Sequence, residues 1–119
     1  MPPLIDPDRL AAYRDALGNW SVTGYIKFRL SESAGRWIER KLGLKQREIK
    51  QLMYEYVAAG GEIDEVRETR DGWKEQHEFH HDLRFTIHEI PVYIETCLKY
   101  RLPVIPDESL IEVVNIHEQ

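Results

Sequence analysis

The chain has 119 residues, 42% hydrophobic and 31% charged, with a formal net charge of -5. This length and balance predict one domain of ordinary soluble composition. No apolar run reaches the roughly 18 residues of a transmembrane helix, so no membrane partner is expected. The first residues lack the basic start and apolar core of a secretory signal. The lone Cys97 excludes a disulfide within one chain, so a cytoplasmic location is predicted.

The charge is unevenly distributed along the chain. Residues 27–50 contain eight basic and three acidic side chains, so this segment is positive while the remainder is strongly negative. A positive segment can hold an anionic partner, or it can simply be the solvated face of helices. If the partner is a nucleic acid, the candidate contacts are Arg36, Arg40, Lys41 and Lys45. The acidic remainder would oppose strong nonspecific binding of a polyanion.

Three elements are predicted in the first part of the chain. A short helix over residues 8–17 begins after Asp6 or Asp8 and ends at Gly18. The segment 25–30 has the pattern of a short strand. Ser31 is suited to cap a second helix, because its hydroxyl can accept hydrogen bonds from free amides of the first turn, and Gly43 would end that helix.

The next segment gives the clearest helical signal. Apolar residues recur there at helical spacing, and they are Ile49, Leu52, Met53, Tyr56 and Val57. Gly60-Gly61 supplies the left-handed stop. Beyond it, Asp71-Gly72 has the composition of a tight hairpin turn.

Residues 73–88 include the sequence HEFHH, which matches the H-E-x-x-H motif of zinc proteases at His77 and His81. In this stretch every even-numbered residue is polar, and most odd-numbered residues are apolar. A period of two predicts one long strand with one buried face. On a strand the two imidazoles would lie roughly 13 Å apart and could not share a zinc ion, so a zinc protease is not expected.

Residues 91–100 also alternate, and a two-residue turn at Glu89-Ile90 would join the two strands as a hairpin. This register places Ile87 opposite Val92 and Phe85 opposite Ile94 on the buried face. On the polar face it places Arg84 opposite Glu95, Thr86 opposite Tyr93 and Asp82 opposite Cys97. A last strand is predicted over residues 109–118.

The predicted fold is therefore α+β, with N-terminal helices packed on one face of an antiparallel sheet of about four strands. Residues 1–119 form a single domain in this prediction. It comprises an N-terminal extension (1–24), a helical segment (25–61) and the sheet (62–119).

The second face of this sheet is a polar patch, and it contains the candidate catalytic residues Arg84, Glu95, Tyr93 and His80. Arg84 and Glu95 could act as a carboxylate base beside a guanidinium that stabilises a phosphate transition state. They could instead be a cross-strand salt bridge with no catalytic role, because exposed pairs of this kind are common and need no function. His80 and Asp82 share this face, but two ligands fall short of a metal site, so neither a metal nor another cofactor is predicted.

The segments 31–53, 60–66, 82–87, 92–96 and 113–118 together resemble a family, the small prokaryotic toxin-like domains related to the RelE, ParE and MqsR toxins. The resemblance covers about residues 25–119. Ser31 and Ala34 match the S-x-H-A-x-x-R opening of one uncharacterised branch, whereas Ser33 and Trp37 replace its histidine and arginine. The resemblance implies a sheet packed on two helices. It also implies metal-independent cleavage of messenger RNA by side chains on the sheet. Residues of the types that such a ribonuclease could use are Arg84, Tyr93, Glu95 and His117.

Two functions are therefore predicted. The first is a toxin-like, metal-independent ribonuclease in which Glu95 or His80 is the base, Arg84 stabilises the phosphorane and Tyr93 positions the substrate. Its partners would be RNA or a cognate antitoxin protein. The alternative is a non-catalytic interaction domain that binds another protein, or a second copy of the chain as a homodimer through an exposed sheet edge.

Overall fold

The computed structural model describes residues 2–100 and 108–119. The first half contains α1 (Pro7–Gly18), β1 (Ile26–Phe28), α2 (Glu32–Trp37), the π-helical turn η1 (Ile38–Leu42) and α3 (Gln46–Ala58). The second half contains β2 (Asp64–Arg67), β3 (Phe79–Ile87), β4 (Ile90–Lys99) and β5 (Leu110–Glu118).

The strands form one mixed sheet with the order β1-β5-β4-β3-β2. Four neighbouring strands pair antiparallel, and β1 joins the edge by pairing parallel to β5. The predicted α+β class is confirmed, but the prediction of about four antiparallel strands was wrong. The segment 26–28 lies far from β5 in sequence and reaches it only after the chain has passed through the helices. Local residue patterns carry no signal for such a long-range parallel pair.

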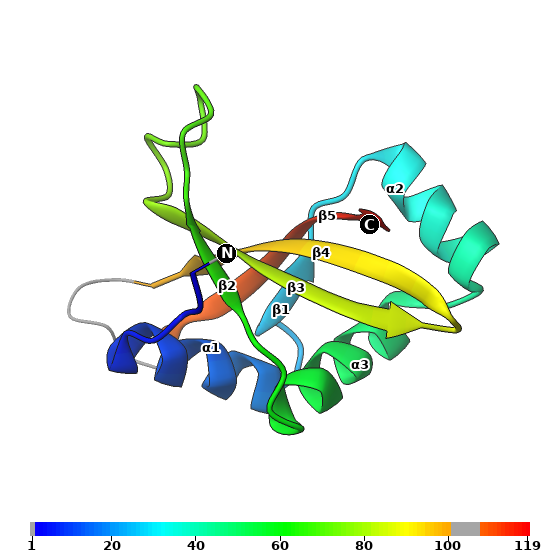
Figure 1. Ribbon diagram of the computed structural model, residues 1–119, viewed down its shortest axis with the longest axis horizontal. Helices are drawn as coiled ribbons and strands as arrows, with labels where there is room; N and C mark the ends of the chain where they lie inside the picture. Colours follow the sequence, from blue (N-terminus) through cyan, green and yellow to red (C-terminus); the bar gives the residue numbers. More distant parts are fainter. Residues whose placement is uncertain (1, 101–107) are drawn as a thin grey trace.

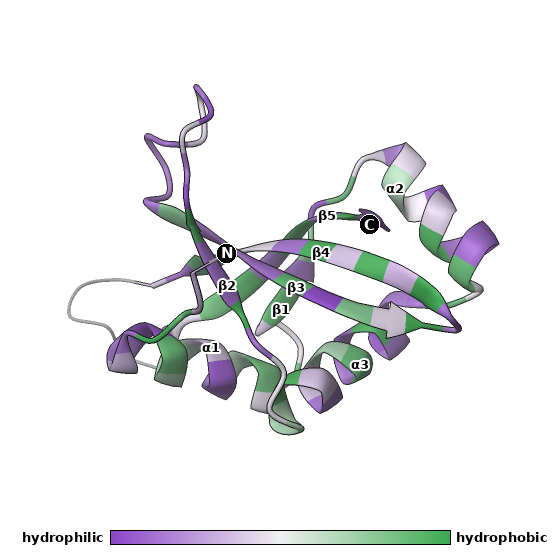
Figure 2. Cartoon of the chain, viewed as in Figure 1, coloured by the Kyte–Doolittle hydropathy of each residue, from purple (hydrophilic) through white to green (hydrophobic). Residues whose placement is uncertain are grey.

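Two helices cover one face of the sheet, as Figure 1 shows for α1 and α3. The ring of Tyr56 in α3 stacks on Phe85 of β3 with centroids 4.8 Å apart. Tyr13 of α1 reaches β4, where its hydroxyl lies 2.8 Å from Thr96 Oγ1. The apolar residues of the central strands are buried beneath these helices, and they include Leu83, Val92, Ile94, Ile111 and Val113. Figure 2 shows green bands alternating with paler ones along β4, as expected for a strand with one buried face.

The helix boundaries follow the capping signals. The Asp6 carboxylate accepts a hydrogen bond from the backbone N–H of Arg9, and Ser31 Oγ accepts one from Ala34, so both residues cap the helices as predicted. Gly43 ends η1 in a left-handed conformation, with φ of 65°. In α3 the predicted apolar stripe buries Ile49, Met53 and Val57, with Leu52 and Tyr56 partly buried at its edge.

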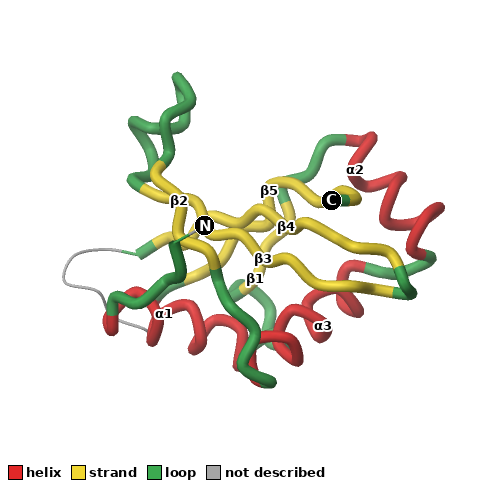
Figure 3. Tube along the Cα trace, viewed as in Figure 1, coloured by secondary structure: helices red, strands yellow, loops and turns green. Residues whose placement is uncertain are grey.

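The segment before β3 is a turn, so the predicted strand over 73–88 was too long. Backbone hydrogen bonds run from Lys74 to Arg70 and from His77 to Trp73, which makes the segment coil back on itself. It projects from the sheet between β2 and β3 in Figure 3. The alternation was weak in this region, because Glu75 and His77 occupied positions of the supposed apolar row. Gly72, with φ of 85°, opens a wide turn and not a two-residue hairpin.

The β3–β4 hairpin turns at His88-Glu89, one residue earlier than predicted. Both residues have positive φ, 50° and 66°, as in a type I′ turn, although neither is the glycine or asparagine that marks such turns in a sequence. The observed register places Asp82 opposite Glu95 and Arg84 opposite Tyr93. The predicted cross-strand pairs were therefore wrong by two positions. Because strands alternate with period two, each residue still lies on its predicted face.

A β-bulge interrupts the pairing of β4 with β5. Glu95 pairs with Asn115, but the next residue, Thr96, pairs with Val113, so Val114 is an extra residue in β5. Such an insertion reverses the alternation of the strand beyond it. Val113 and Ile116 are both buried for this reason, while His117 lies opposite Tyr93 on the other face.

Candidate functional site

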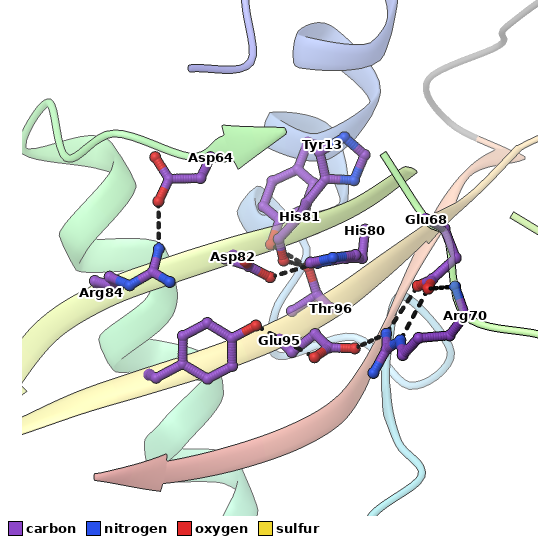
Figure 4. A network of polar contacts seen from close by, with 11 residues as sticks. Tyr13, Asp64, Glu68, Arg70, His80, His81, Asp82, Arg84, Glu95 and Thr96 are labelled. Carbon is purple, nitrogen blue, oxygen red and sulfur yellow. Dashed lines mark hydrogen bonds and ion pairs between the residues drawn. The ribbon is translucent and has the colours of Figure 1, made fainter. Parts of the chain in front are cut away.

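The sheet face opposite α1 and α3 carries a network of charged residues, which Figure 4 shows from close by. β3 contributes the even-numbered side chains, β4 contributes the odd-numbered ones, and the segment after β2 adds two more. We call its central part the open-face cluster, and it consists of Glu68, Arg70, His80, Asp82 and Glu95.

His80, Asp82 and Glu95 form the middle of this cluster. His80 Nδ1 lies 2.8 Å from Asp82 Oδ1, and because a carboxylate only accepts, this ring nitrogen carries the proton. This hydrogen bond raises the pKa of His80 above its usual value, although partial burial opposes the shift. The two carboxylates lie on paired positions of adjacent strands, with side chains only 1% and 7% exposed. The predicted polar patch is therefore correct in composition, but its acidic groups are buried.

Arg70 holds the other side of the cluster together. Its Nε and Nη2 donate to the two oxygens of Glu68, each at 2.8 Å, and its backbone N–H donates to Glu68 Oε1 at 3.0 Å. Nη2 also donates to Glu95 Oε2 at 2.6 Å. These hydrogen bonds lower the pKa of Glu68 to about 2. The Glu68 side chain is 1% exposed, whereas Arg70 is half exposed, so one guanidinium shields two buried carboxylates from solvent.

Tyr93 borders the cluster toward β5. Its hydroxyl donates to Glu95 Oε1 at 3.2 Å, and its ring contacts that of His117, with centroids 4.8 Å apart. Burial, together with the nearby charges of Asp82 and Glu95, raises the pKa of Tyr93 far above its usual value. The phenol therefore keeps its proton, so Tyr93 can donate hydrogen bonds but cannot serve as a base.

Arg84 lies on this face but does not pair with Glu95 as predicted. Its Nη1 bonds to Asp64 Oδ2 of β2 at 2.6 Å, and its guanidinium stacks over Tyr93 at 4.8 Å from the ring centroid. The two-residue difference in register explains the change, because Tyr93 occupies the position predicted for Glu95. The Arg84 side chain is one-third exposed and remains accessible to a ligand.

The predicted nucleic-acid contacts lie apart from this cluster. Arg36, Arg40, Lys41 and Lys45 are all exposed, and they follow one another through α2, η1 and the start of α3. Arg36 lies 3.7 Å from Glu32 one turn earlier. In Figure 1, α2 lies at one end of the sheet and the turn that carries Arg70 projects at the other.

His81, the neighbour of His80, lies on the opposite face beneath α1. Its Nε2 is 3.0 Å from Glu65 Oε2, and Arg9 also donates two hydrogen bonds to that carboxylate. Burial lowers the pKa of His81, so the ring is neutral at neutral pH. We call this second group the helix-face cluster, and it consists of Arg9, Tyr13, Glu65, His81 and Thr96.

The structure does not bring the two histidines of the HEFHH sequence together as zinc ligands. His77 lies in the turn before β3, and His81 is bonded to Glu65 on the helix face. Within residues 2–100 and 108–119, the ligand atoms of His80, Asp82 and Glu95 lie within 4.8 Å of one another, and this is the one such group of three or more potential ligands. The sequence prediction had all three residues on one face, but it placed Glu95 opposite Arg84 and not opposite Asp82.

Neither Cys97 nor a cavity at the start of β3 contributes to the predicted chemistry. Burial raises the pKa of the Cys97 thiol to about 11, so it is not a reactive thiolate. The cavity, of about 640 Å³, lies at the start of β3, where Arg9 and Lys99 contribute to its wall. None of the four predicted catalytic residues is among the residues that line it.

The sequence interpretation missed Asp64, Glu68 and Arg70. Asp64 begins β2, Glu68 continues the same even-numbered face one residue past its end, and Arg70 follows in the turn. The charged segment 62–70 contained a weak alternation, but nothing in it indicated which strand it pairs with. In the structure this segment pairs with β3, with Asp64 opposite Asp82.

No protein-family model, curated protein or solved structure matches this chain. Among the described residues, every helix is too short or too polar to span a bilayer.

Proposed function

We propose that this chain is a toxin-like ribonuclease domain that cleaves RNA without a metal ion, with the open sheet face as its working surface. The observation that carries the proposal is the His80–Asp82 pair, in which a buried carboxylate orients an imidazole at 2.8 Å. Two guanidinium groups lie on the same face: that of Arg70 is half exposed and that of Arg84 is one-third exposed. The family resemblance of residues 25–119 is consistent with such an activity.

In this proposal His80 is the general base. RNA carries its own nucleophile, the 2′-hydroxyl, so cleavage requires removal of that proton and stabilisation of the phosphorane charge. Asp82 holds His80 through Nδ1, which leaves Nε2 for the substrate. Glu95 is the weaker of the two predicted bases, because it is buried and bonded to Arg70.

The remaining side chains supply charge and protons. Arg84, and also Arg70, would stabilise the phosphorane, while Tyr93 would position the substrate through its hydroxyl. His117 is exposed beside Tyr93 and could return a proton to the leaving 5′-oxygen. The exposed residues Arg36, Arg40, Lys41 and Lys45 would hold phosphates farther along the strand.

A cleavage assay with total RNA and short labelled RNAs, in the presence of a chelator, tests this function. We expect micromolar protein to cleave RNA, and we expect induced expression to arrest growth. His80→Gln should lower the rate by about 100-fold or more. Arg84→Gln should lower it by roughly tenfold or more. The matched controls are His88→Gln in the hairpin turn and Arg29→Gln, which pairs with buried Glu112 as Arg84 pairs with Asp64.

The absence of both cleavage and growth arrest would reject the ribonuclease and favour the alternative, a non-catalytic interaction domain. A second copy could not readily join the sheet at β2, because residues 2–4 already lie along that edge. Leu4 N–H donates to Ile63 at 2.7 Å, and Glu65 N–H donates to Pro2 at 2.8 Å. In a homodimer formed by strand addition, the short β1 edge would therefore be the site of pairing.

A further inference from the structure

We propose that His80, Asp82 and Glu95 form a binding site for one divalent transition-metal ion, with zinc as the best fit. Their ligand atoms already lie within 4.8 Å of one another. Zinc with nitrogen and carboxylate ligands at 2.0–2.2 Å requires ligand atoms roughly 3.4 Å apart. Small side-chain rotations close that difference, because the three residues lie on the same face of two paired strands.

The negative charge of the open-face cluster favours binding of a cation. Glu68, Asp82 and Glu95 are all buried, and Arg70 is the guanidinium that bonds to two of them. His80 is the hydrogen-bond partner of the third. Three buried carboxylates against one permanent cation leave the site with a negative excess, and buried charge without a partner is costly.

Asp82 provides an independent observation that points to a ligand. Its side chain is 1% exposed, and in the described structure its Oδ2 atom is buried without a hydrogen-bond partner. The other oxygen of the same carboxylate bonds to His80 at 2.8 Å, so one oxygen is held and Oδ2 is left for a ligand. Metal coordination would satisfy this oxygen, since a carboxylate offers lone pairs on both atoms.

The chemical types of the three ligand groups determine which ion fits the site. One imidazole nitrogen and two carboxylates suit zinc and similar transition metals, whereas Mg²⁺ and Ca²⁺ are usually bound by oxygen alone. Three protein ligands leave one tetrahedral position for water. Arg70 competes with the ion for Glu95, because its guanidinium donates to that carboxylate at 2.6 Å.

Calorimetric titration of the chelator-treated protein with zinc tests the site, and magnesium is the comparison ion. We expect one zinc ion per chain with micromolar or tighter affinity, and much weaker magnesium binding. Glu95→Gln should weaken zinc binding by at least about tenfold. Glu112→Gln is the matched control and should not change it, because Glu112 is a similarly buried glutamate on the same face that pairs with Lys99 and Arg29.

Arg70→Gln provides a test in the opposite direction. Removal of the competing guanidinium should tighten zinc binding, which a merely structural role of Arg70 would not produce. If Asp82→Asn fails to fold, the comparison of Glu95→Gln with Arg70→Gln still decides the question. Equal zinc affinity in wild type and Glu95→Gln would overturn the proposal, as would equal affinity for zinc and magnesium.

The titration contains no RNA, so its outcome is separate from that of the proposed ribonuclease. A zinc ion at this site would occupy the lone pair of His80 and would therefore inhibit RNA cleavage. Zinc binding, together with no cleavage by the chelator-treated protein, would leave this inference intact and reject the ribonuclease. Cleavage without zinc binding would do the reverse.

Discussion

His80 and His81 are consecutive residues of β3, yet they belong to two polar clusters with opposite electrostatic character. Beneath α1, the helix-face cluster pairs Arg9 with Glu65 at 2.8 Å, and the low pKa of His81 keeps that ring neutral. On the other face, three buried carboxylates have Arg70 and His80 as their basic partners. The pKa of His80 is raised, which favours the charged form of its ring. The first cluster is balanced in charge, while the second retains a negative excess.

The difference distinguishes a polar group that serves the fold from one that is available for chemistry. The helix-face cluster joins α1 to β2, β3 and β4, since Tyr13 bonds to Thr96 and Glu65 bonds to both Arg9 and His81. The open-face cluster joins neighbouring strands that backbone hydrogen bonds already connect. Unmatched charge at such a position is typical of functional sites, where local stability is sacrificed.

The largest expected effect comes from removing one carboxylate from each cluster. Glu65→Gln leaves Arg9 and His81 without their charged partner and should lower the free energy of unfolding by about 2 kcal/mol. Glu95→Gln removes one of three crowded carboxylates and should leave stability unchanged or raise it by up to about 1 kcal/mol. Urea denaturation of both variants measures the contrast. Equal losses would show that the two clusters do not differ as described.

Acid titration should show how much the ion pair between Glu68 and Arg70 contributes to the stability of the fold. The pKa of Glu68 falls from 4.5 to about 2 in the folded protein, because Arg70 bonds to its carboxylate. The stabilisation is therefore complete above about pH 5 and is lost as the pH falls toward 2. Because Arg70 is half exposed, we expect a contribution of about 1–2 kcal/mol, less than the full shift would give.

The test compares unfolding free energies of wild type and Glu68→Gln across this pH range. The variant should be less stable at neutral pH, and the difference should shrink as the pH falls from 5 to about 2. Parallel curves would show that the Glu68–Arg70 bond does not stabilise the fold.

The smallest expected effect concerns two tyrosines, one in each region. Tyr13→Phe removes a buried hydrogen bond to Thr96 and should cost about 1 kcal/mol. Tyr93→Phe removes a longer bond to Glu95 at the partly exposed edge of the network and should cost less than about 0.5 kcal/mol. Thermal unfolding of the two variants gives the comparison, and a larger loss for Tyr93→Phe would reverse our assignment of structural roles.

The face of each residue in β3 and β4 could be predicted from the sequence, but its neighbour on the adjacent strand could not. Alternation with period two assigned Leu83 and Ile94 to the core and Arg84 and Glu95 to the other side. A shift of two positions preserves that assignment, so the error in the hairpin turn left the faces intact. The position of the turn could not be predicted, because its left-handed residues are His88 and Glu89 and not the glycine or asparagine typical of such turns.

The candidate site was predictable to a similar extent. His80, Glu95, Tyr93 and Arg84 were expected on one face, and all four lie there. The contribution of Arg70 was not predictable, because it depends on a turn that returns to the sheet and on pairing between β2 and β3. Helix caps and the apolar stripe of α3 were correctly predicted, since these signals depend on near neighbours in the sequence.

The extra residue in β5 sets the phase of the end of the chain. Val113 and Ile116 lie three positions apart and are both buried, because the bulge absorbs one residue between them. Deletion of Val114 would leave a regular strand in which Asn115 still lies opposite Glu95 and His117 still lies opposite Tyr93, so every later side chain would keep its surface. The contact of His117 with Tyr93 therefore depends on the register of β5 and would survive the loss of this one codon.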